Sequence, residues 1–221
     1  MAGIQSQREK LREQRKATQR KKTITWGSIV AIVAVAIVII TFLPKWTANK
    51  ELLTNQSGFS IGDPNAPVKV EEFSDFRCSH CRDFSEDLEP DFIKNYVDTN
   101  KVYFTFYNYP FLADDSTDAA EAAYCAADQN AFWQYKSLLF SNSSDQNAYS
   151  ETNLISYAKL LGLDIDKFTS CLQTDQHLEA IAADKEYAKS LGVDSTPQFS
   201  VNGTLVFSSE LDQTVEAELA K

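Results

Sequence analysis

The chain has 221 residues, of which 43% are hydrophobic and 24% are charged, and its formal net charge is −10. This balance is typical of a globular protein and excludes a disordered or fibrous chain. The acidic excess also argues against a protein that binds nucleic acid, because contacts with phosphates need lysine and arginine.

The charge is unevenly distributed along the chain. Residues 1–25 contain eight basic and two acidic residues, so this head carries +6, whereas the remainder carries −16. Residues 26–43 then form an uncharged stretch rich in Ile, Val and Ala, bracketed by Trp26 and Trp46. About 20 apolar residues span a bilayer as a helix, and positively charged flanks stay inside. We therefore predict a cytoplasmic head at 1–25, a single-pass transmembrane anchor at 26–43 and an extracytoplasmic body.

Two other interpretations of the apolar stretch remain open. A cleaved signal peptide usually has a shorter apolar region, of about 7–15 residues, followed by small residues. Here Lys45, Trp46 and Thr47 follow, which is a poor cleavage site. A buried core helix is the other alternative, but core helices are seldom apolar on every face. We favour an uncleaved anchor.

The body begins with turn-forming residues and then alternates between strands and helices. We predict a linker at 44–57, within a segment that stays rich in turn residues up to Pro67. Strands are predicted at 68–76 and 101–109, on either side of a helix at 79–97 that should kink or divide at Pro90.

A long helical block, at about 114–191, follows the second strand and is expected to stop at Gly192. Strands at 197–201 and 204–207 then flank Asn202-Gly203, a pair suited to a tight type I′ turn, and a helix at 209–220 closes the chain. Alternating strands and helices imply an α/β layer fold. Because the helical block is too long for one crossover, we interpret it as an insertion.

Two of the four cysteines, Cys78 and Cys81, form a C-x-x-C motif where a strand gives way to a helix. Such a motif near a βαβ pattern indicates a redox pair. A helix start stabilises an anion, so we expect Cys78 to ionise easily and Cys81 to attack the mixed disulfide that Cys78 forms. A protonated His80 beside the thiolate would make the disulfide more oxidising, with a plain surface histidine as the alternative.

Zinc is the main chemical alternative for this motif. A structural zinc site needs four ligands, usually from two such pairs, and the chain has no second C-x-x-C. A site that uses all four cysteines, or that adds His80 or His177, remains open. His177 otherwise lies in a polar helical segment and is expected to be inert.

Three segments resemble the DsbA-like thiol-disulfide oxidoreductases, in particular their membrane-anchored bacterial branch. Residues 72–81 (Glu-Phe-Ser-Asp-Phe-Arg-Cys-Ser-His-Cys) are similar to the active-site segment, and residues 62–68 to the lead-in to the first strand. Thr196-Pro197-Gln198-Phe199, followed by the Asn-Gly pair, resembles the cis-proline loop and hairpin. The likeness covers about residues 58–221 and implies a thioredoxin-like α/β fold with an inserted helical subdomain. Ser79 departs from the pattern, since well-studied oxidases carry proline there.

The resemblance implies a role for each matched position. Cys78 would be the exposed attacking cysteine and Cys81 the buried resolving one. Pro197 would be cis and packed against the pair, with Thr196 offering its backbone to an extended substrate. Glu72 matches a buried acid that assists proton transfer, and an exposed strand residue is the alternative there.

The other two cysteines, Cys125 and Cys171, lie in the helical block. Because thiols outside the membrane tend to oxidise, we predict a structural disulfide between them, chemically separate from the reactive pair. Closing the chain between Cys125 and Cys171 into a loop contributes about 4 kcal/mol to the stability of the fold in the loop-entropy model. Two separate buried thiols are the alternative.

We therefore expect an extracytoplasmic thiol-disulfide oxidoreductase, in the first place an oxidase of cysteine pairs in reduced exported proteins, working without a cofactor. The resemblance implies reoxidation by a quinone-linked membrane protein of DsbB or vitamin-K-epoxide-reductase type. A disulfide isomerase or reductase is the alternative within the same class. A noncatalytic membrane-tethered chaperone or a metal-binding module is the alternative from another class.

Overall fold

The structure, a computed structural model, describes residues 56–221. The predicted head, the anchor at 26–43 and most of the predicted linker lie outside these residues. Among residues 56–221, no helix is long and apolar enough to cross a membrane.

Six strands form one sheet with the spatial order β1-β2-β4-β3-β5-β6. The strands are β1 (Gln56–Ser57), β2 (Ser60–Ile61), β3 (Val68–Ser74), β4 (Val102–Asn108), β5 (Gln198–Val201) and β6 (Thr204–Phe207). The central strands β3 and β4 are parallel, and every other neighbouring pair is antiparallel. This arrangement confirms the predicted α/β architecture, because a parallel pair needs the crossover helix that the sequence places between its strands.

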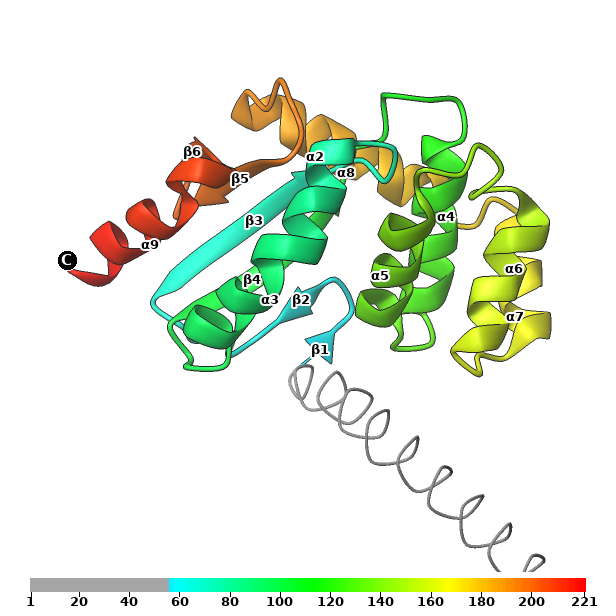
Figure 1. Cartoon of the computed structure of the whole chain (residues 1–221), viewed down its shortest axis with the longest axis horizontal. Coiled ribbons are helices and arrows are strands. Elements are labelled where there is room, and N and C mark those ends of the chain that lie inside the picture. The colour runs from blue at the N-terminus through cyan, green and yellow to red at the C-terminus, as the bar shows by residue number, and fades with distance from the viewer. Residues whose placement is uncertain (1–55) are drawn as a thin grey trace, which may run out of the picture. The chain divides into compact units, whose positions relative to one another are not determined.

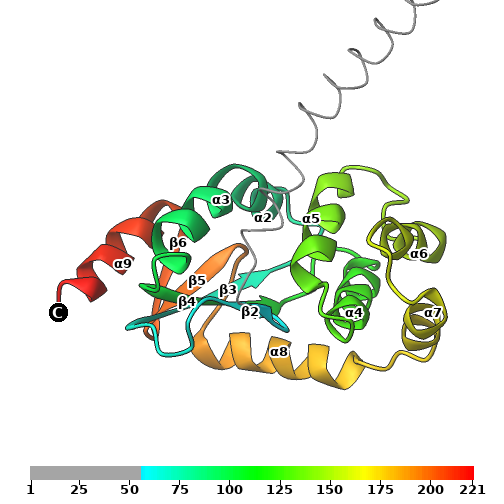
Figure 2. The ribbon, with the colours of Figure 1, turned by 90° about the horizontal axis from the view of Figure 1, so that it is seen from below.

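Helices cover both faces of this sheet (Figures 1 and 2). They are α2 (Ser79–Asp83), α3 (Glu89–Phe92), α4 (Ser116–Ala127), α5 (Phe132–Asn142), α6 (Glu151–Leu160), α7 (Ile165–Gln173), α8 (Leu178–Leu191) and α9 (Leu211–Leu219). Figure 2 shows α2, α3 and α9 on one face, α8 across the other, and α4 to α7 grouped beside the sheet.

The crossover between β3 and β4 is helical over the whole predicted range. Two π-helical turns, Phe84–Leu88 and Ile93–Val97, interrupt it after α2 and after α3. Pro90 is the second residue of α3, where its missing N–H costs little, so the predicted division at this proline is confirmed.

The helical block differs from the prediction at its last helix. We expected α8 to belong to the insertion, but it lies across the sheet and contacts β4. Ala188 of α8 is fully buried in a small cluster with Phe73, Tyr109 and Val193 on this face of the sheet. Helices α4 to α7 therefore form the insertion proper. Gly192 ends α8 with φ of 86°, as predicted.

The segment predicted as linker and turn contains two strands. β1 and β2 form a short hairpin, and β2 pairs with β4 through Ser60 and Ile61. The prediction was wrong because strands of two residues leave no alternation to detect. Gly62 follows them with φ of 101°, and a Cβ there would lie 2.7 Å from the Val102 carbonyl oxygen.

The C-terminal hairpin follows the prediction. Asn202 and Gly203 both have positive φ, 46° and 88°, as a type I′ turn requires. The helix after it begins with a 3₁₀ turn and continues as α9, whose Val215 is fully buried.

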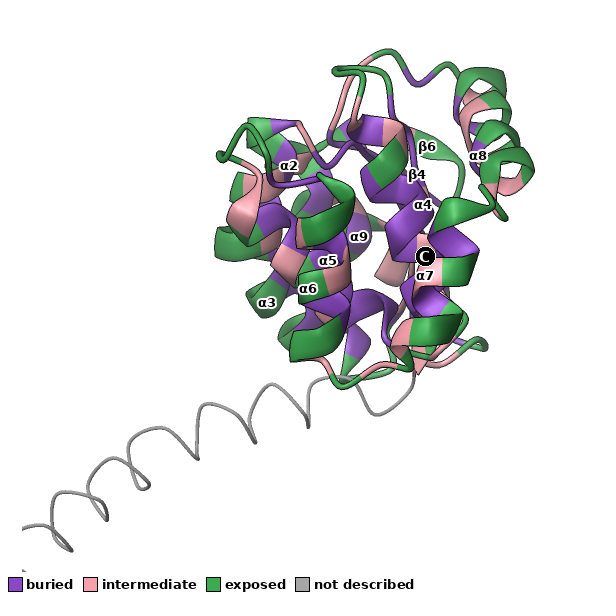
Figure 3. Cartoon of the chain, turned by 90° about the vertical axis from the view of Figure 1, so that its right-hand side faces the viewer, coloured by how far each residue is buried: buried purple, intermediate pink, exposed green. Residues whose placement is uncertain are grey.

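Alternation along the central strands determines which side chains approach the reactive pair. Val68, Val70, Glu72 and Ser74 of β3 share one face, which turns toward the main core. Figure 3 shows that α4 in the insertion is also largely buried. Its alanines at 119, 122, 123 and 126 have no exposed surface, so the neighbouring elements pack close to it.

Candidate active site

The loop between β3 and α2 is organised by one buried carboxylate. Asp75 accepts hydrogen bonds from the backbone N–H groups of Arg77, Phe111 and Leu112, each 2.8 Å long. The Ser116 hydroxyl at the start of α4 donates a fourth bond, also of 2.8 Å. Asp75 therefore joins the loop that carries Cys78 to both the end of β4 and the insertion.

Cys78 lies directly before α2 and faces the loop that precedes β5. The backbone N–H of Cys81 donates to Cys78 Sγ at 3.3 Å, and the Cys78 thiol donates to the Thr196 carbonyl oxygen at 3.2 Å. The Thr196–Pro197 peptide bond is cis. The structure thus brings together four of the residues selected from the sequence: Cys78, Cys81, Thr196 and Pro197. Cys78 and Thr196, which share a hydrogen bond, lie 118 positions apart in the chain.

The two thiols are unequal. Cys81 has no exposed surface, whereas Cys78 retains 6%. We expected Cys78 to be exposed, but most of its surface is buried because the loop that carries Thr196 packs against its sulfur. Cys78 is nevertheless the more exposed cysteine of the pair. Both thiols are free, as in a reduced pair.

The surroundings of the two sulfurs shift their pKa values in opposite directions. The hydrogen bond from the Cys81 thiol, helped by the Thr196 side chain and by the backbone N–H groups of Cys81 and His80, lowers the pKa of Cys78 to about 6. Burial raises the pKa of Cys81, and the neighbouring Cys78 raises it further. Cys78 is therefore a thiolate at neutral pH while Cys81 holds its proton.

His80 contributes through its backbone more than through its ring. The backbone N–H of His80 helps to lower the pKa of Cys78. Its imidazole is 83% exposed and lies 3.9 Å from the carboxylate of Asp83. We expected the ring to stand beside the thiolate, and the contact that the structure gives it is with Asp83 instead.

A buried group of three charges lies beneath the reactive pair. Glu72 on β3 is completely buried, and its Oε2 is 3.2 Å from Nζ of Lys136 on α5. Glu89 of α3 accepts a second bond from the same ammonium and is itself hydrogen-bonded to Ser85 at 3.0 Å. Burial, together with Glu89, raises the pKa of Glu72 to about 7, although Lys136 opposes this.

Ser74 connects this charged group to the cysteines. Its hydroxyl donates to Glu72 Oε1 at 2.5 Å, and the Ser74 side chain lowers the pKa of Cys81 against the effect of burial. Ser74 therefore lies between Cys81 and a carboxyl group whose pKa is raised to about 7.

Arg77 fastens the active-site loop to the insertion. Its guanidinium pairs with Asp115, donates to the carbonyl oxygens of Ser143 and Asp145 at 2.8 Å each, and lies 4.2 Å from the Tyr149 ring. The pKa of Arg77 is raised, first through its hydrogen bond with Asp115, so it stays charged.

The remaining cysteines form a disulfide. Cys125 on α4 and Cys171 on α7 are bonded to each other, with Cα atoms 5.8 Å apart, and their bond ties two helices of the insertion together. No site within residues 56–221 gathers all four cysteines, so the four-cysteine zinc site considered from the sequence is excluded.

Lys136, Glu89 and Asp75 were missed by sequence reasoning as members of the site. A signal existed for Lys136, since it is the one charge on a helix face that also carries Phe132, Trp133, Leu139 and Phe140. A lysine in such a position needs a buried partner. Nothing in the sequence names Glu89 as one of the two partners, because it lies in another helix.

Comparisons with known proteins agree with this geometry. A family model described as thioredoxin matches residues 54–219. The probable disulfide bond formation protein D of Bacillus anthracis is 33% identical over 208 residues, which span 87% of this chain and 95% of that protein.

Solved structures share the fold. BdbD from Bacillus subtilis, in its oxidised form, superposes with a TM-score of 0.70 at 25% identity, covering 76% of this chain and 98% of that one. DsbA from Chlamydia trachomatis has a TM-score of 0.65 at 20% identity, covering 75% of this chain and 93% of that one. At that identity the second likeness concerns the fold alone.

Proposed function

The chain belongs to the thioredoxin-fold family that contains the disulfide bond formation proteins and is a thiol-disulfide oxidoreductase, and we propose that Cys78 and Cys81 are its reacting pair. The observation that carries this proposal is the inequality of the two thiols: the pKa of Cys78 is lowered to about 6, and that of the buried Cys81 is raised. A stabilised thiolate favours the reduced state and makes the disulfide a better oxidant.

The oxidation proceeds by two exchanges. A substrate thiolate attacks Cys78 Sγ of the Cys78–Cys81 disulfide, so a mixed disulfide forms and Cys81 leaves as a thiolate that takes up a proton. A second substrate thiolate then attacks the mixed disulfide at the substrate sulfur, and Cys78 leaves as a stable thiolate. The substrate loses two electrons and gains a disulfide, while the pair gains the two electrons.

Glu72 supplies the proton that Cys81 takes up in this proposal, and Ser74 passes it on. The supporting observations are the 2.5 Å bond between Ser74 and Glu72 and a pKa of Glu72 near 7. Groups with pKa values near the working pH are the most effective acids and bases.

Thr196 and Pro197 form the proposed binding site for the substrate backbone. The Thr196 carbonyl oxygen lies within hydrogen-bonding distance of Cys78 Sγ, so a peptide chain held along this loop brings its cysteine to the reactive sulfur. An extended peptide that adds to exposed backbone is a common mode of recognition.

We place the reaction outside the cytoplasm, on a chain anchored by residues 26–43. The basic head and the apolar stretch support this topology. The substrates are reduced exported proteins, and a quinone-linked membrane protein of DsbB or vitamin-K-epoxide-reductase type returns the pair to the disulfide. Anchoring in one membrane raises the effective concentration of the two partners. Protease digestion of intact cells should remove the body and leave the head protected.

The test of the reaction is the pH dependence of alkylation of the reduced chain. One thiol should react with an apparent pKa near 6, and Cys78→Ser should abolish this phase. The oxidised chain should also oxidise a reduced, unfolded protein, forming one substrate disulfide for each Cys78–Cys81 disulfide that is reduced. A near-normal thiol pKa together with no oxidation would leave a noncatalytic chaperone as the better interpretation. Faster reshuffling of scrambled disulfides than net oxidation would favour an isomerase.

A further inference from the structure

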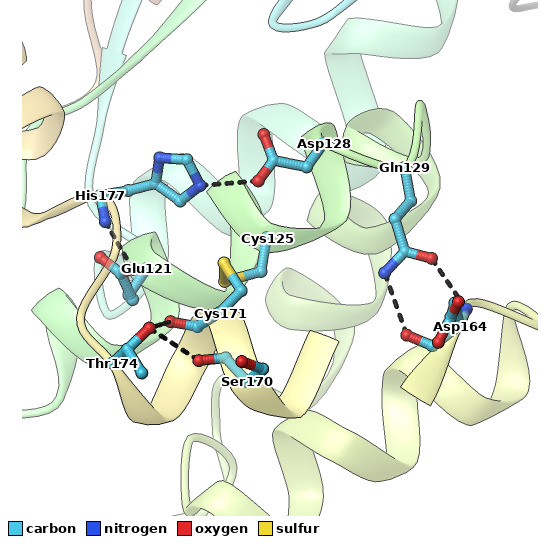
Figure 4. Close-up of a disulfide and its surroundings, with 9 residues drawn as sticks. All are labelled: Glu121, Cys125, Asp128, Gln129, Asp164, Ser170, Cys171, Thr174 and His177. Atoms are coloured by element: carbon cyan, nitrogen blue, oxygen red, sulfur yellow. Dashed lines mark hydrogen bonds and ion pairs between the residues drawn. A yellow bond between two sulfur atoms is a disulfide. The ribbon is translucent and has the colours of Figure 1, made fainter. Parts of the chain in front are cut away.

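His177 lies beside the structural disulfide of the insertion (Figure 4). Cys125 comes from α4, Cys171 from α7, and His177 directly precedes α8. The two sulfur atoms and one ring nitrogen of His177 all lie within 4.8 Å of one another. Three elements of the fold thus place two sulfurs and an imidazole at one point, which the redox reaction of Cys78 and Cys81 does not use.

The imidazole is held by two ring contacts, and the backbone that carries it is held by a third. Its Nε2 is 2.8 Å from Asp128 Oδ2, its ring stacks on Tyr124 at 5.1 Å, and its backbone N–H donates to Glu121 Oε1 at 2.8 Å. Only 16% of the His177 side chain is exposed. A ring that is oriented in advance loses little freedom when it binds a ligand.

The disulfide borders on a cleft, although both of its cysteines are buried, with 1% and 6% of their surface exposed. A cleft of about 510 Å³ is lined by both cysteines together with Asp128, Gln129, Asp166, Lys167, Ser170 and Gln176. Small reductants and metal ions can therefore come close to the disulfide through this cleft.

We propose that Cys125, Cys171 and His177 bind a zinc ion when the disulfide is reduced. Two thiolates and an imidazole are preferred zinc ligands, and a water molecule from the cleft completes the tetrahedron. Zn–S bonds of about 2.3 Å place two sulfurs roughly 3.8 Å apart. The two sulfurs are bonded to each other in this structure, so they separate to this distance once the disulfide is reduced. The same three residues then hold α4, α7 and the start of α8 together through the metal in place of the disulfide.

A dithiol reductant supplies two electrons and two protons, the bond between the two sulfurs breaks, and the reductant becomes a disulfide. Both thiols then release their protons to solvent as zinc binds, because the thiolate is the ligand. Every newly made chain also has both thiols before its disulfide forms, so the zinc-binding state precedes the oxidised one.

The test uses the full chain in detergent with Cys78→Ser and Cys81→Ser, so that Cys125 and Cys171 are the only thiols. The chain is reduced with a phosphine, and the phosphine is then removed. One cobalt(II) ion should bind per chain, give a thiolate charge-transfer band and be displaced by zinc. His177→Ala should weaken zinc binding at least about tenfold, since loss of an outer partner alone typically costs 10- to 100-fold. His80→Ala, which removes the chain's other imidazole, is the matched control and should leave zinc binding unchanged. The oxidised chain should bind no cobalt.

Two further measurements keep the outcome clear. Far-UV circular dichroism of the oxidised His177→Ala chain shows whether that variant folds, because the disulfide is then intact. If the reduced chain loses helix, zinc should restore it. Absence of the charge-transfer band, equal affinity after His177→Ala, or a reduced chain that stays unfolded with zinc would each overturn the proposal, without bearing on the oxidase reaction.

Discussion

Lys136 Nζ lies 3.2 Å from Glu72 Oε2, and neither side chain has more than 1% of its surface exposed. Glu89 contacts the same ammonium, so one buried cation serves two buried carboxyl groups. Burying such a group is expensive, and apolar residues of similar volume would often be as stable. Ser74 is hydrogen-bonded to Glu72 of this group, which places the group for the proton transfer proposed above.

Replacing Lys136 by methionine should therefore strongly destabilise the chain. Two carboxyl groups would lose their cation in a buried site, and breaking a buried pair typically costs about 3–5 kcal/mol. The thermal unfolding midpoint measures this loss. Lys189→Met, which removes an exposed pair with Glu186, is the control and should leave the midpoint unchanged. Adding Glu72→Gln and Glu89→Gln to Lys136→Met should recover much of the loss, and no recovery would contradict the electrostatic explanation.

Replacing Glu72 by glutamine separates the proton relay from the fold. The pKa of Glu72 is raised to about 7, so the step that protonates Cys81 should change with pH around neutrality. Glu72→Gln should slow the release of Cys81 at least about tenfold and should flatten this pH dependence. The tenfold figure is a lower bound, because general acid–base catalysis typically contributes 10²- to 10⁴-fold. Ser74→Ala should have the same effect. Stopped-flow measurement of mixed-disulfide formation across this pH range provides the test, and an unchanged profile in both variants would contradict the relay.

Local patterns were sufficient to predict much of this fold. The strands predicted at 68–76 and 101–109, the Asn202-Gly203 turn and the stop at Gly192 depend on neighbouring residues, and each is confirmed, with the strands observed at Val68–Ser74 and Val102–Asn108. The hairpin of β1 and β2 escaped detection, because β2 is defined by its pairing with β4 and not by its own two residues. The position of α8 could not be predicted either, because its contact with β4 depends on the path of the chain through helices α4 to α7.

The reactive pair was visible in the sequence because its chemistry is local. C-x-x-C spans one helical turn, so the Cys81 N–H reaches Cys78 Sγ without help from the rest of the fold. The charged group beneath the pair is nonlocal: Glu72 and Lys136 lie 64 positions apart. The imidazole of His80 was misplaced for a related reason, because periodicity does not say that its exposed ring meets Asp83.

Replacing Gly62 by alanine should destabilise the body. Gly62 has φ of 101°, and a Cβ would lie 2.7 Å from the Val102 carbonyl oxygen, a backbone atom that cannot move aside. Backbone strain of this kind typically costs about 1–3 kcal/mol. Gly58→Ala is the matched control: Gly58 also has positive φ, of 58°, but a Cβ there meets nothing within 4 Å. Urea unfolding midpoints should fall more for Gly62→Ala than for Gly58→Ala, and equal losses would show that the close approach does not matter.

The stability of the reduced chain should depend on pH through Cys78. Its pKa falls from 9.0 to about 6 on folding, so the folded state binds this proton less tightly than the unfolded state. The contribution is complete above pH 9 and is lost as the pH falls through 6. Between these values the reduced chain should gain stability relative to the oxidised chain, by at most about 1.4 kcal/mol per pH unit.

Urea unfolding of both redox forms, measured from pH 6 to pH 9, tests this relationship. Cys81 and Glu72 have raised pKa values, and their contributions to stability are lost as the pH rises through those values. The comparison therefore needs reduced Cys78→Ser, which keeps Cys81 and Glu72 but has no Cys78 thiolate, measured against the same oxidised unmodified chain. The rise with pH should disappear in that variant. A rise that survives Cys78→Ser would mean that another group titrates, and a flat difference in the unmodified chain would show that Cys78 has an ordinary pKa.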